Sequence, residues 1–246
     1  MTTLNNKVAI VTGSSKGIGA QIAMLLAESG AKTVINYASD DAAANDIVSQ
    51  IKAAGGEAIA IQADVSDTQQ VAMLFDTTIS EFGKPDILVN SAGMMINKPI
   101  AETTDEDFDR TFAVNAKGTF NTLREAAAKL NDGGRIVNLS STTTRMMLPT
   151  YGTYCATKGA VEQLTRVFAK EIGERGITVN AVSPGPTDTE LFNQGKSDET
   201  IEKLANMSAF NRIGEPVDIA RVVLFLVSEE AAWVTGQNIG ANGGVA

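Results

Sequence analysis

Two of the chain's three tyrosines lie close together in the stretch TYGTYCATKG, residues 150–159. Tyr154 is followed four residues later by Lys158, and residues four apart on a helix share a face. The residue four positions after Tyr151 is Cys155, so Tyr151 has no cation at helical spacing. The spacing favours Tyr154, and not Tyr151, as a proton donor. The alternative is a core tyrosine that happens to lie beside a surface lysine.

The chemistry of such a pair depends on the pKa of the phenol. That pKa is about 10 in water, and lowering it to about 7 requires roughly 4 kcal/mol. An ammonium ~4 Å away, at an effective dielectric constant of about 20, supplies roughly that free energy. We therefore expect Lys158 to lower the pKa of Tyr154.

Composition excludes several other kinds of site. The sequence has no histidine, which removes Ser-His-Asp and Cys-His triads and the usual catalytic zinc sites, so we expect no metal. A net charge of -9 argues against a nucleic-acid partner. The longest apolar runs, such as VVLFLV at 222–227, are far shorter than the ~18 residues that span a bilayer. One cysteine and the lack of a secretory leader predict a reducing, cytoplasmic location.

Short β-branched runs alternate with segments of helical period along the whole chain. This order indicates βαβ units, whose right-handed crossovers give a parallel sheet covered on both faces. We predict a doubly wound, Rossmann-type α/β fold in a single domain, residues 1–246, with a lid at about 187–214. The expected strands of the seven-stranded sheet lie within residues 7–13, 32–37, 58–64, 86–93, 134–141, 177–185 and 237–244.

The first expected strand runs into the glycine-rich stretch TGSSKGIG, residues 12–19, which precedes a helical pattern. Gly13 allows a tight turn, and Gly17 and Gly19 allow a pyrophosphate to approach the backbone closely. The start of the following helix supplies N–H donors and the positive end of its dipole. A nucleotide site is the prediction, and a plain turn is the alternative.

These motifs and others together resemble the short-chain dehydrogenase/reductase family, from Lys7 to about Gly244. Besides TGSSKGIG and YxxxK they are NSAG at 90–93, VNAKG at 114–118, a serine thirteen residues before Tyr154, and SPG at 183–185. Ser91 stands where the family often has asparagine, a mild departure. The resemblance implies an enzyme with a dinucleotide cofactor.

The resemblance also implies catalytic roles for four residues. Tyr154 gives a proton to a carbonyl in reduction, while Lys158 lowers the phenol pKa and binds the nicotinamide ribose. Ser141, chosen over Ser140 by its distance from Tyr154, holds the carbonyl oxygen. Asn115 holds a water that links Lys158 to solvent, the alternative being a helix residue that bonds backbone.

The cofactor site implied by the resemblance draws on most loops of the fold. Asp64 and Val65 are the expected adenine contacts, although an aspartate there could instead cap the next helix. The expected cofactor-binding residues are Gly13, Ser15, Lys16, Gly17, Ile18, Gly19, Asn36, Tyr37, Ala38, Ser39, Asp64, Val65, Asn90, Ala92, Gly93, Tyr154, Lys158, Pro184, Gly185, Thr187 and Thr189.

The end of the second expected strand predicts NADP(H) rather than NAD(H). An NAD site places an acidic residue there, and this chain has neutral Asn36. Asn36 and Ser39 could donate hydrogen bonds to the 2′-phosphate, and Lys16 resembles the basic residue that NADP-dependent members set against it. The alternative for Lys16 is a solvated loop lysine. Asp40 and Asp41 lie one or two residues too late to reach the ribose if the strand ends at Tyr37, and a one-residue shift of that boundary would weaken the NADP(H) prediction.

The expected substrate pocket is rich in methionine, which suggests an adaptable apolar wall. Arg145 is the one doubtful cation near it, so a neutral ketone or aldehyde is the favoured substrate. The predicted pocket residues are Met94, Met95, Thr143, Met147, Tyr151, Leu191, Phe192 and Met207, with Thr142, Met146 and Leu148 beside them.

Two other functions remain open at this stage. The first is a 3-oxoacyl-acyl-carrier-protein reductase, which is disfavoured because Asn131 and Asp132 stand where such enzymes carry basic residues, although Arg175 is retained. The second is a nucleotide-binding sensor without catalysis. A methyltransferase using a similar glycine loop finds no support after the third strand. The family resemblance also predicts a homotetramer, with indirect support from an apolar stripe at Val161, Leu164, Phe168 and Ile172.

Overall fold

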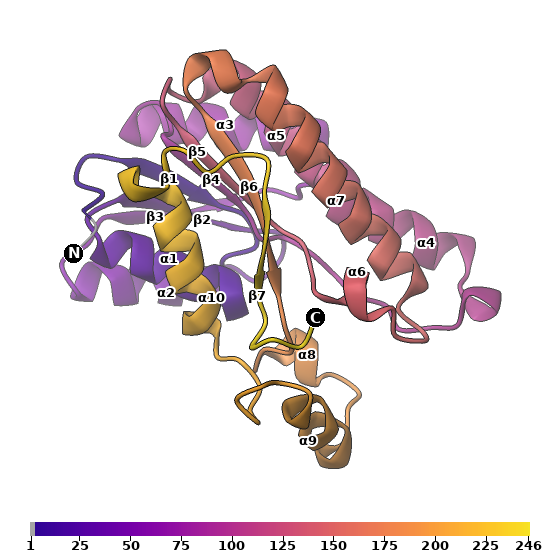
Figure 1. The fold of residues 1–246 in the computed structure, drawn as a ribbon. Coiled ribbons are helices and arrows are strands. Elements are labelled where there is room, and N and C mark those ends of the chain that lie inside the picture. The colour runs from indigo at the N-terminus through magenta and orange to yellow at the C-terminus, as the bar shows by residue number, and fades with distance from the viewer. Residues whose placement is uncertain (1–2) are drawn as a thin grey trace.

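A single parallel sheet organises residues 3–246, which are the residues that the computed structural model describes (Figure 1). Its strand order is β3-β2-β1-β4-β5-β6-β7, with every neighbouring pair parallel. Each strand lies inside one of the seven predicted runs, so the predicted fold class is confirmed. The strands are β1 (Val8–Val11), β2 (Lys32–Tyr37), β3 (Ala58–Gln62), β4 (Ile87–Asn90), β5 (Arg135–Leu139), β6 (Thr178–Pro184) and β7 (Asn238–Ala241).

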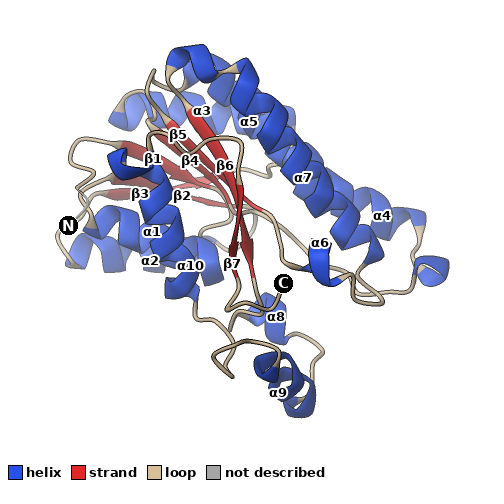
Figure 2. Ribbon diagram, viewed as in Figure 1, coloured by secondary structure: helices blue, strands red, loops and turns tan. Residues whose placement is uncertain are grey.

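Helices cover both faces of this sheet (Figure 2). One face carries α1 (Gly17–Glu28), α2 (Asp41–Ala53) and α10 (Pro216–Val227). The other face carries α3 (Thr68–Phe82), α5 (Gly118–Lys129) and α7 (Gly152–Glu171), and α4 (Asp105–Phe112) runs into α5 through a π-helical turn at Ala113–Lys117. The shorter helices are α6 (Thr143–Met146), α8 (Glu190–Asn193) and α9 (Asp198–Asn206), with single 3₁₀ turns at Ile100–Glu102, Gly173–Arg175 and Glu229–Ala231.

The central strands are apolar on both sides because both faces are covered by helices. In β1, Val11 packs toward α1 and α10, whereas its neighbour Ile10 packs toward α3 and α5. In β5, Val137 and Ile136 divide between the two faces in the same way. No helix among residues 3–246 is both long and apolar enough to cross a bilayer.

The apolar stripe of α7 is explained by this packing. Ile172 belongs to the core beneath α7, and Leu164 and Phe168 pack against that core. Val161 is also fully buried. The stripe therefore faces the protein interior, and it gives no support to the predicted homotetramer, which rests on the family resemblance alone.

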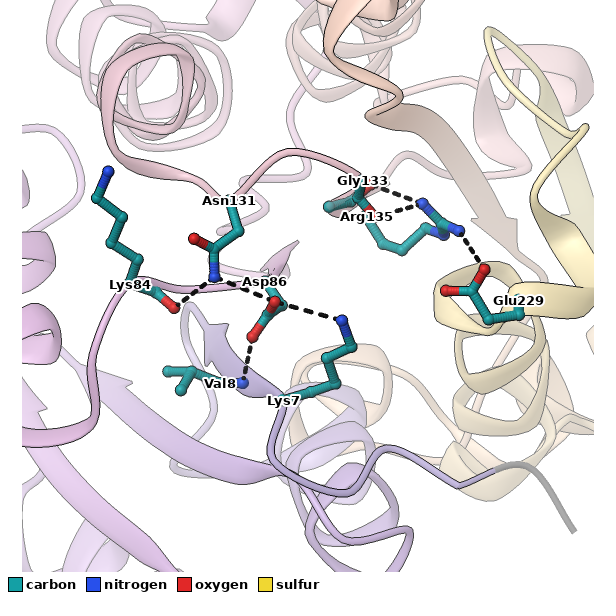
Figure 3. A network of polar contacts seen from close by, with 9 residues as sticks. Lys7, Val8, Lys84, Asp86, Asn131, Gly133, Arg135 and Glu229 are labelled. Carbon is teal, nitrogen blue, oxygen red and sulfur yellow. Dashed lines mark hydrogen bonds and ion pairs between the residues drawn. The ribbon is translucent and has the colours of Figure 1, made fainter.

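A polar network ties together the amino-terminal ends of β1, β4 and β5 (Figure 3). Asp86 accepts hydrogen bonds from the Val8 N–H at 2.9 Å and the Asn131 side chain at 3.1 Å. Arg135, only 6% exposed, donates to the Gly133 carbonyl and pairs with Glu229 at 3.3 Å. Three neighbouring strands are thereby held in register at this edge, and their opposite ends form the site described below.

Candidate active site

A cleft of about 720 Å³ opens at the carboxyl ends of the strands, where the strand order changes direction between β1 and β4. This is the place where open α/β sheets bind their ligands. Most of the predicted cofactor residues line the cleft, namely Gly13, Ser15, Lys16, Gly17, Ile18, Gly19, Asn36, Ala38, Ser39, Asp64, Val65, Ala92, Gly93, Tyr154, Lys158, Pro184, Gly185, Thr187 and Thr189.

In the β1–α1 loop, Gly13 and Gly19 lie so close to neighbouring backbone that neither position has room for a side chain. Gly13 has a φ of +59°, and a Cβ on it would lie 2.6 Å from the Ala92 Cα. A Cβ on Gly19 would lie 2.5 Å from the Gly13 carbonyl oxygen. The loop turns tightly over the start of α1, whose free N–H groups face the cleft end of the sheet. This cradle fits the diphosphate of a dinucleotide.

Asn36 has a different role from the predicted one. Its side chain is 1% exposed, accepts a hydrogen bond from the Gly13 N–H at 3.2 Å and donates to the Ile61 and Ala63 carbonyls at 3.3 and 3.0 Å. Both amide hydrogens are therefore used, and none is left for a phosphate. The prediction that Asn36 donates to the 2′-phosphate is wrong, because this side chain holds the glycine loop against β3.

Tyr37 and Asn90 are the two predicted cofactor residues that do not line the cleft. The Tyr37 hydroxyl donates to Asp41 at 2.6 Å, and the ring is buried. The Asn90 amide donates to Asn138 at 2.8 Å and accepts from Thr122 at 2.7 Å, linking β4 to β5 and α5. Side-chain contact of Tyr37 and Asn90 with a cofactor is not supported by this arrangement.

Lys16 reaches across the mouth of the cleft to the segment after β6. Its Nζ lies 2.7 Å from Glu190 Oε2, and both side chains are largely exposed. That segment begins and ends at a parallel bridge between Thr187 and Gly214 and carries α8 and α9, and its role as a lid stays a prediction. Ser39 is exposed and also lines the cleft.

Tyr154 and Lys158 meet on one face of α7, as their spacing predicted. The Lys158 Nζ lies 5.7 Å from the centre of the Tyr154 ring and donates to the Leu139 carbonyl at 2.7 Å. Desolvation raises the pKa of Tyr154 to about 12, opposed by the hydrogen bond with Ser141. Desolvation also lowers the pKa of Lys158 to about 8. The expected lowering of the Tyr154 pKa is therefore wrong for the protein alone, because desolvation is the largest influence on this phenol and raises its pKa.

Ser141 is held beside Tyr154 by its own loop. Its Oγ accepts hydrogen bonds from the Thr143 hydroxyl at 2.8 Å and the Thr143 N–H at 3.3 Å. With both lone pairs occupied, Ser141 can act toward Tyr154 or a ligand only as a hydrogen-bond donor. Ser140 is engaged elsewhere, donating to Glu162 at 2.9 Å, which agrees with the choice of Ser141 over Ser140.

Asn115 lies in the π-helical turn between α4 and α5, a feature frequent at functional sites. Its amide accepts from the Met94 N–H at 2.8 Å and donates to the Met94 carbonyl at 2.9 Å and the Thr157 hydroxyl at 3.0 Å. Gly93 separates it from Lys158, since a Cβ there would lie 3.4 Å from Asn115 Oδ1 and 3.5 Å from Lys158 Nζ. The predicted water link from Asn115 to Lys158 stays a prediction.

The apolar end of the cleft contains six of the predicted pocket residues: Met94, Met95, Thr143, Tyr151, Leu191 and Phe192. Met147 and Met207 are not among the lining residues and are 76% and 48% exposed. Met147 ends α6 in a left-handed conformation, with a φ of 51°, and Met207 follows the last residue of α9. Both therefore lie at helix ends that face away from the pocket wall.

Three charged residues of the cleft, Asp40, Arg110 and Glu190, are absent from the predicted site residues, and the sequence reasoning places Asp40 beyond reach of the ribose. Arg110 lines the cleft from α4, one helical turn before Ala113 and Val114, which also line it. Residues three and four apart share a helix face, so this spacing could have predicted that Arg110 lines the cleft. Glu190 was missed because nothing in its local pattern shows that the chain returns to Lys16.

The pKa of Lys158 sets a pH dependence for the carbonyl reduction that the sequence predicts. Below about pH 8 the buried amine is charged, and above it that charge is lost. Because the pKa of Tyr154 is about 12, the phenol keeps its proton throughout this range. We expect kcat/KM for reduction to be level between about pH 6 and 7.5 and to fall about tenfold per unit well above 8. A level profile up to about pH 10, measured at constant ionic strength, would contradict this role for Lys158.

Known proteins resemble this chain over nearly its whole length. A family model described as Enoyl-(Acyl carrier protein) reductase matches residues 13–246. The chain is 45% identical to a short-chain type dehydrogenase/reductase of Picea abies, over 98% of this chain and 93% of that protein. It is 48% identical to the NADPH-dependent aldehyde reductase-like protein, chloroplastic, of Arabidopsis thaliana, over 98% and 94% of the two chains.

A solved structure shows the same similarity in three dimensions. The angucycline C-6 ketoreductase LanV with bound NADP has a TM-score of 0.94 and 41% identity, covering 99% of this chain and 97% of that one. The seven-stranded parallel sheet with helices on both faces agrees with these similarities. The chain belongs to the short-chain dehydrogenase/reductase family of oxidoreductases.

Proposed function

We propose that this protein reduces a neutral ketone or aldehyde to the alcohol with NADPH, reversibly. The observation that carries the proposal is the meeting of the Ser141 hydroxyl and the Tyr154 phenol on one wall of the cleft, with Lys158 behind them. Two hydroxyl donors beside each other suit a single carbonyl oxygen. The NADPH-dependent relative and the NADP-bound neighbour support the choice of cofactor.

In this proposal the chain's own groups manage the oxygen and its proton. NADPH, when bound, supplies a hydride to the carbonyl carbon. Ser141 donates a hydrogen bond to the carbonyl oxygen as negative charge develops there. Tyr154 then gives its proton to that oxygen, because an alkoxide is more basic than a phenolate. The Lys158 ammonium stabilises the resulting tyrosinate until it is reprotonated.

The cofactor is held, in the same proposal, by the cradle of the β1–α1 loop and the start of α1. Lys16 and Ser39 lie at the cleft rim, where they can receive a 2′-phosphate with a charge-assisted and a neutral hydrogen bond. Lys158 contacts the nicotinamide ribose. Thr187 and Thr189, which line the cleft at the base of the segment after β6, close the carboxamide end.

The pocket wall favours a neutral, apolar substrate. Met94, Met95 and Phe192 line it, and they bind by shape and burial rather than by charge. Arg110 is the cation at its rim, which leaves room for a polar substituent at the outer end.

The 3-oxoacyl-acyl-carrier-protein alternative loses further support in the structure. Arg175, the one basic residue retained for such a partner, pairs with Asp132 at 2.7 Å and donates to the Ala127 and Leu130 carbonyls. It is therefore occupied within the protein. A chain with a net charge of -9 also repels an acidic carrier.

A substrate panel tests the proposal. Purified protein and NADPH are mixed with small aryl ketones, aldehydes, β-keto esters and a 3-oxoacyl thioester, sugar alcohols are mixed with the protein and NADP+ for the reverse reaction, and cofactor turnover is measured. We expect the highest kcat/KM with a neutral ketone or aldehyde. The highest value with the 3-oxoacyl thioester would favour the carrier-protein alternative, and tight NADPH binding without turnover of any compound would favour the sensor.

Cofactor preference depends on Lys16. Lys16→Ala removes the cation nearest the proposed phosphate position, and we expect kcat/KM with NADPH to fall about 10-fold while the value with NADH changes less than about 2-fold. Glu190→Gln frees Lys16 from its ion pair, so kcat/KM with NADPH should rise by about 2- to 5-fold. A wild-type value with NADH equal to or above that with NADPH would refute the preference.

Asn36→Asp, a change that would introduce an acidic residue as in NAD-dependent enzymes, is not a clean test here. It removes the donors to the Ile61 and Ala63 carbonyls and sets a carboxylate against them, so we expect loss of stability. Ser39→Asp places the carboxylate on the exposed rim instead, and it should shift preference toward NADH.

A further inference from the structure

Glu162 is a partly buried carboxylate that the proposed chemistry does not use. It lies on α7 one helical turn after Lys158 and two turns after Tyr154, so it continues the catalytic face of that helix. Its side chain is only 13% exposed. A carboxylate in such a place is costly unless several donors satisfy it, so its partners indicate what it does.

The partners of Glu162 lie on both sides of Ser141 in sequence. Glu162 Oε1 accepts a hydrogen bond from the Ser140 hydroxyl at 2.9 Å and another from the Thr144 hydroxyl at 2.9 Å. Ser140 is buried and also lies 3.4 Å from the Lys158 carbonyl. One oxygen on α7 thus fixes the residue before Ser141 and the residue after Thr143.

Thr143 is the residue that orients the Ser141 hydroxyl. Its own hydroxyl and N–H both donate to Ser141 Oγ, leaving that group a single hydrogen to give. Thr143 begins α6, which lies beside α7 (Figure 2). Two hydrogen bonds link α6 to α7: the Thr144 hydroxyl donates to Glu162, and the Cys155 thiol donates to the Thr143 carbonyl at 3.3 Å. If Thr144 were released from Glu162, the weaker thiol contact would be left to hold Thr143 to the helix that carries Tyr154.

The charge of Glu162 has little to do with Lys158. Burial alone accounts for the lowered pKa of Lys158, and the nearest cation to the carboxylate is Arg166, whose Nη2 is 3.8 Å from Oε2. Arg166 is half exposed, and such a pair contributes little. The two hydroxyl contacts therefore account for the placement of Glu162.

We infer that Glu162 is a positioning residue that holds the Ser141 hydroxyl at the proton-donating face of α7, an inference that rests on the proposed reductase function. It acts on the oxygen of the substrate only through Ser141. A small displacement of Ser141 weakens its hydrogen bond to the carbonyl oxygen of the substrate. That hydrogen bond is strongest when negative charge develops on the oxygen during the reaction. Removal of Glu162 should therefore lower kcat and leave the affinity for substrate nearly unchanged.

The test compares three single variants with the parent enzyme. Glu162→Leu removes the acceptor and should lower kcat about 30-fold, with the Kd for NADPH, followed by fluorescence titration, within about 3-fold. Glu162→Gln keeps a neutral acceptor at the same place and should lower kcat only about 3-fold. Arg166→Gln, the matched control, removes the ion pair alone and should leave kcat within about 2-fold. The alkaline fall in kcat/KM near pH 8 should not move in any variant.

A double-mutant cycle with Ser141→Ala separates positioning from a general effect on the fold. In a Ser141→Ala background, Glu162→Leu should lower kcat by less than about 3-fold, because the group it positions is gone. The inference is overturned if Glu162→Leu lowers kcat as much in the Ser141→Ala background as in the parent enzyme. It is also overturned if Glu162→Leu alone keeps kcat within about 2-fold of the parent. Should the leucine variant not fold, Glu162→Gln takes its place, and its 3-fold loss must vanish in the Ser141→Ala background. An inactive parent would overturn the proposed function and this inference together.

Discussion

Tyr154→Phe is expected to lower kcat for carbonyl reduction by about 10³-fold while leaving the Kd for NADPH within about 3-fold. The change removes one hydroxyl from a ring that otherwise keeps its place on α7 beside Lys158. No other group in the arrangement replaces the proton. Ser141 remains, so some turnover from hydrogen bonding and positioning should persist. Steady-state kinetics at saturating ketone measure the loss.

Tyr151→Phe is the matched control for that variant. The two rings lie edge to face with their centres 6.5 Å apart, and both line the cleft. Tyr151 has no lysine at helical spacing, so its variant should keep kcat within about 3-fold and change mainly KM. Equal losses of kcat in the two phenylalanine variants would remove the basis for choosing Tyr154.

Lys158→Met is expected to lower kcat by about 100-fold. A unit charge 5.7 Å from the ring centre, at an effective dielectric constant of about 20, stabilises a tyrosinate by about 3 kcal/mol. That free energy corresponds to roughly two powers of ten in rate. Methionine keeps most of the buried side-chain volume, so the fold should survive. The Kd for NADPH should also rise, because Lys158 is proposed to bind the ribose.

Lys170→Met provides the control, since Lys170 lies exposed near the end of the same helix. Its kcat should equal that of the parent. If Lys158→Met raised only the Kd for NADPH and kept kcat at saturating cofactor within about 3-fold, Lys158 would be a cofactor ligand without influence on the tyrosine.

The parts of the fold that could be predicted are those that depend on local pattern. Apolar β-branched runs such as VAIV can only be two-sided core strands when helices separate them, so the parallel sheet followed from the sequence. The pairing of Tyr154 with Lys158 followed from helical geometry in the same way. Glu162 lies at the next step of that spacing and could have been found by extending it.

The failed predictions concern quantities that depend on tertiary contacts. The type of Asn36 shows that it can donate hydrogen bonds, but only the packing of β2 beside β3 shows that Ile61 and Ala63 already accept them. The pKa argument assumed ~4 Å in a partly solvated site. In the structure, desolvation is the largest influence on the phenol, and it raises the pKa instead of lowering it.

The sequence also could not place the ends of short helices. Met147 has a left-handed backbone conformation, and its side chain is exposed to solvent. Methionine rarely adopts this conformation, so no local sequence pattern predicts it. The pairing of Lys16 with Glu190 joins residues 174 positions apart, and it depends on how the segment after β6 folds back over the glycine loop.

The central claim, hydride transfer from NADPH to a carbonyl at this site, is tested most directly by isotope transfer. NADPH carrying deuterium at the transferable C4 position of the nicotinamide is incubated with the protein and the best ketone of the panel, and the product is analysed by mass spectrometry and NMR. The account predicts one deuterium on the carbinol carbon for each NADPH oxidised, and a rate that collapses in Tyr154→Phe. Oxidation of NADPH without label in an alcohol product, or no oxidation despite tight binding, would contradict it.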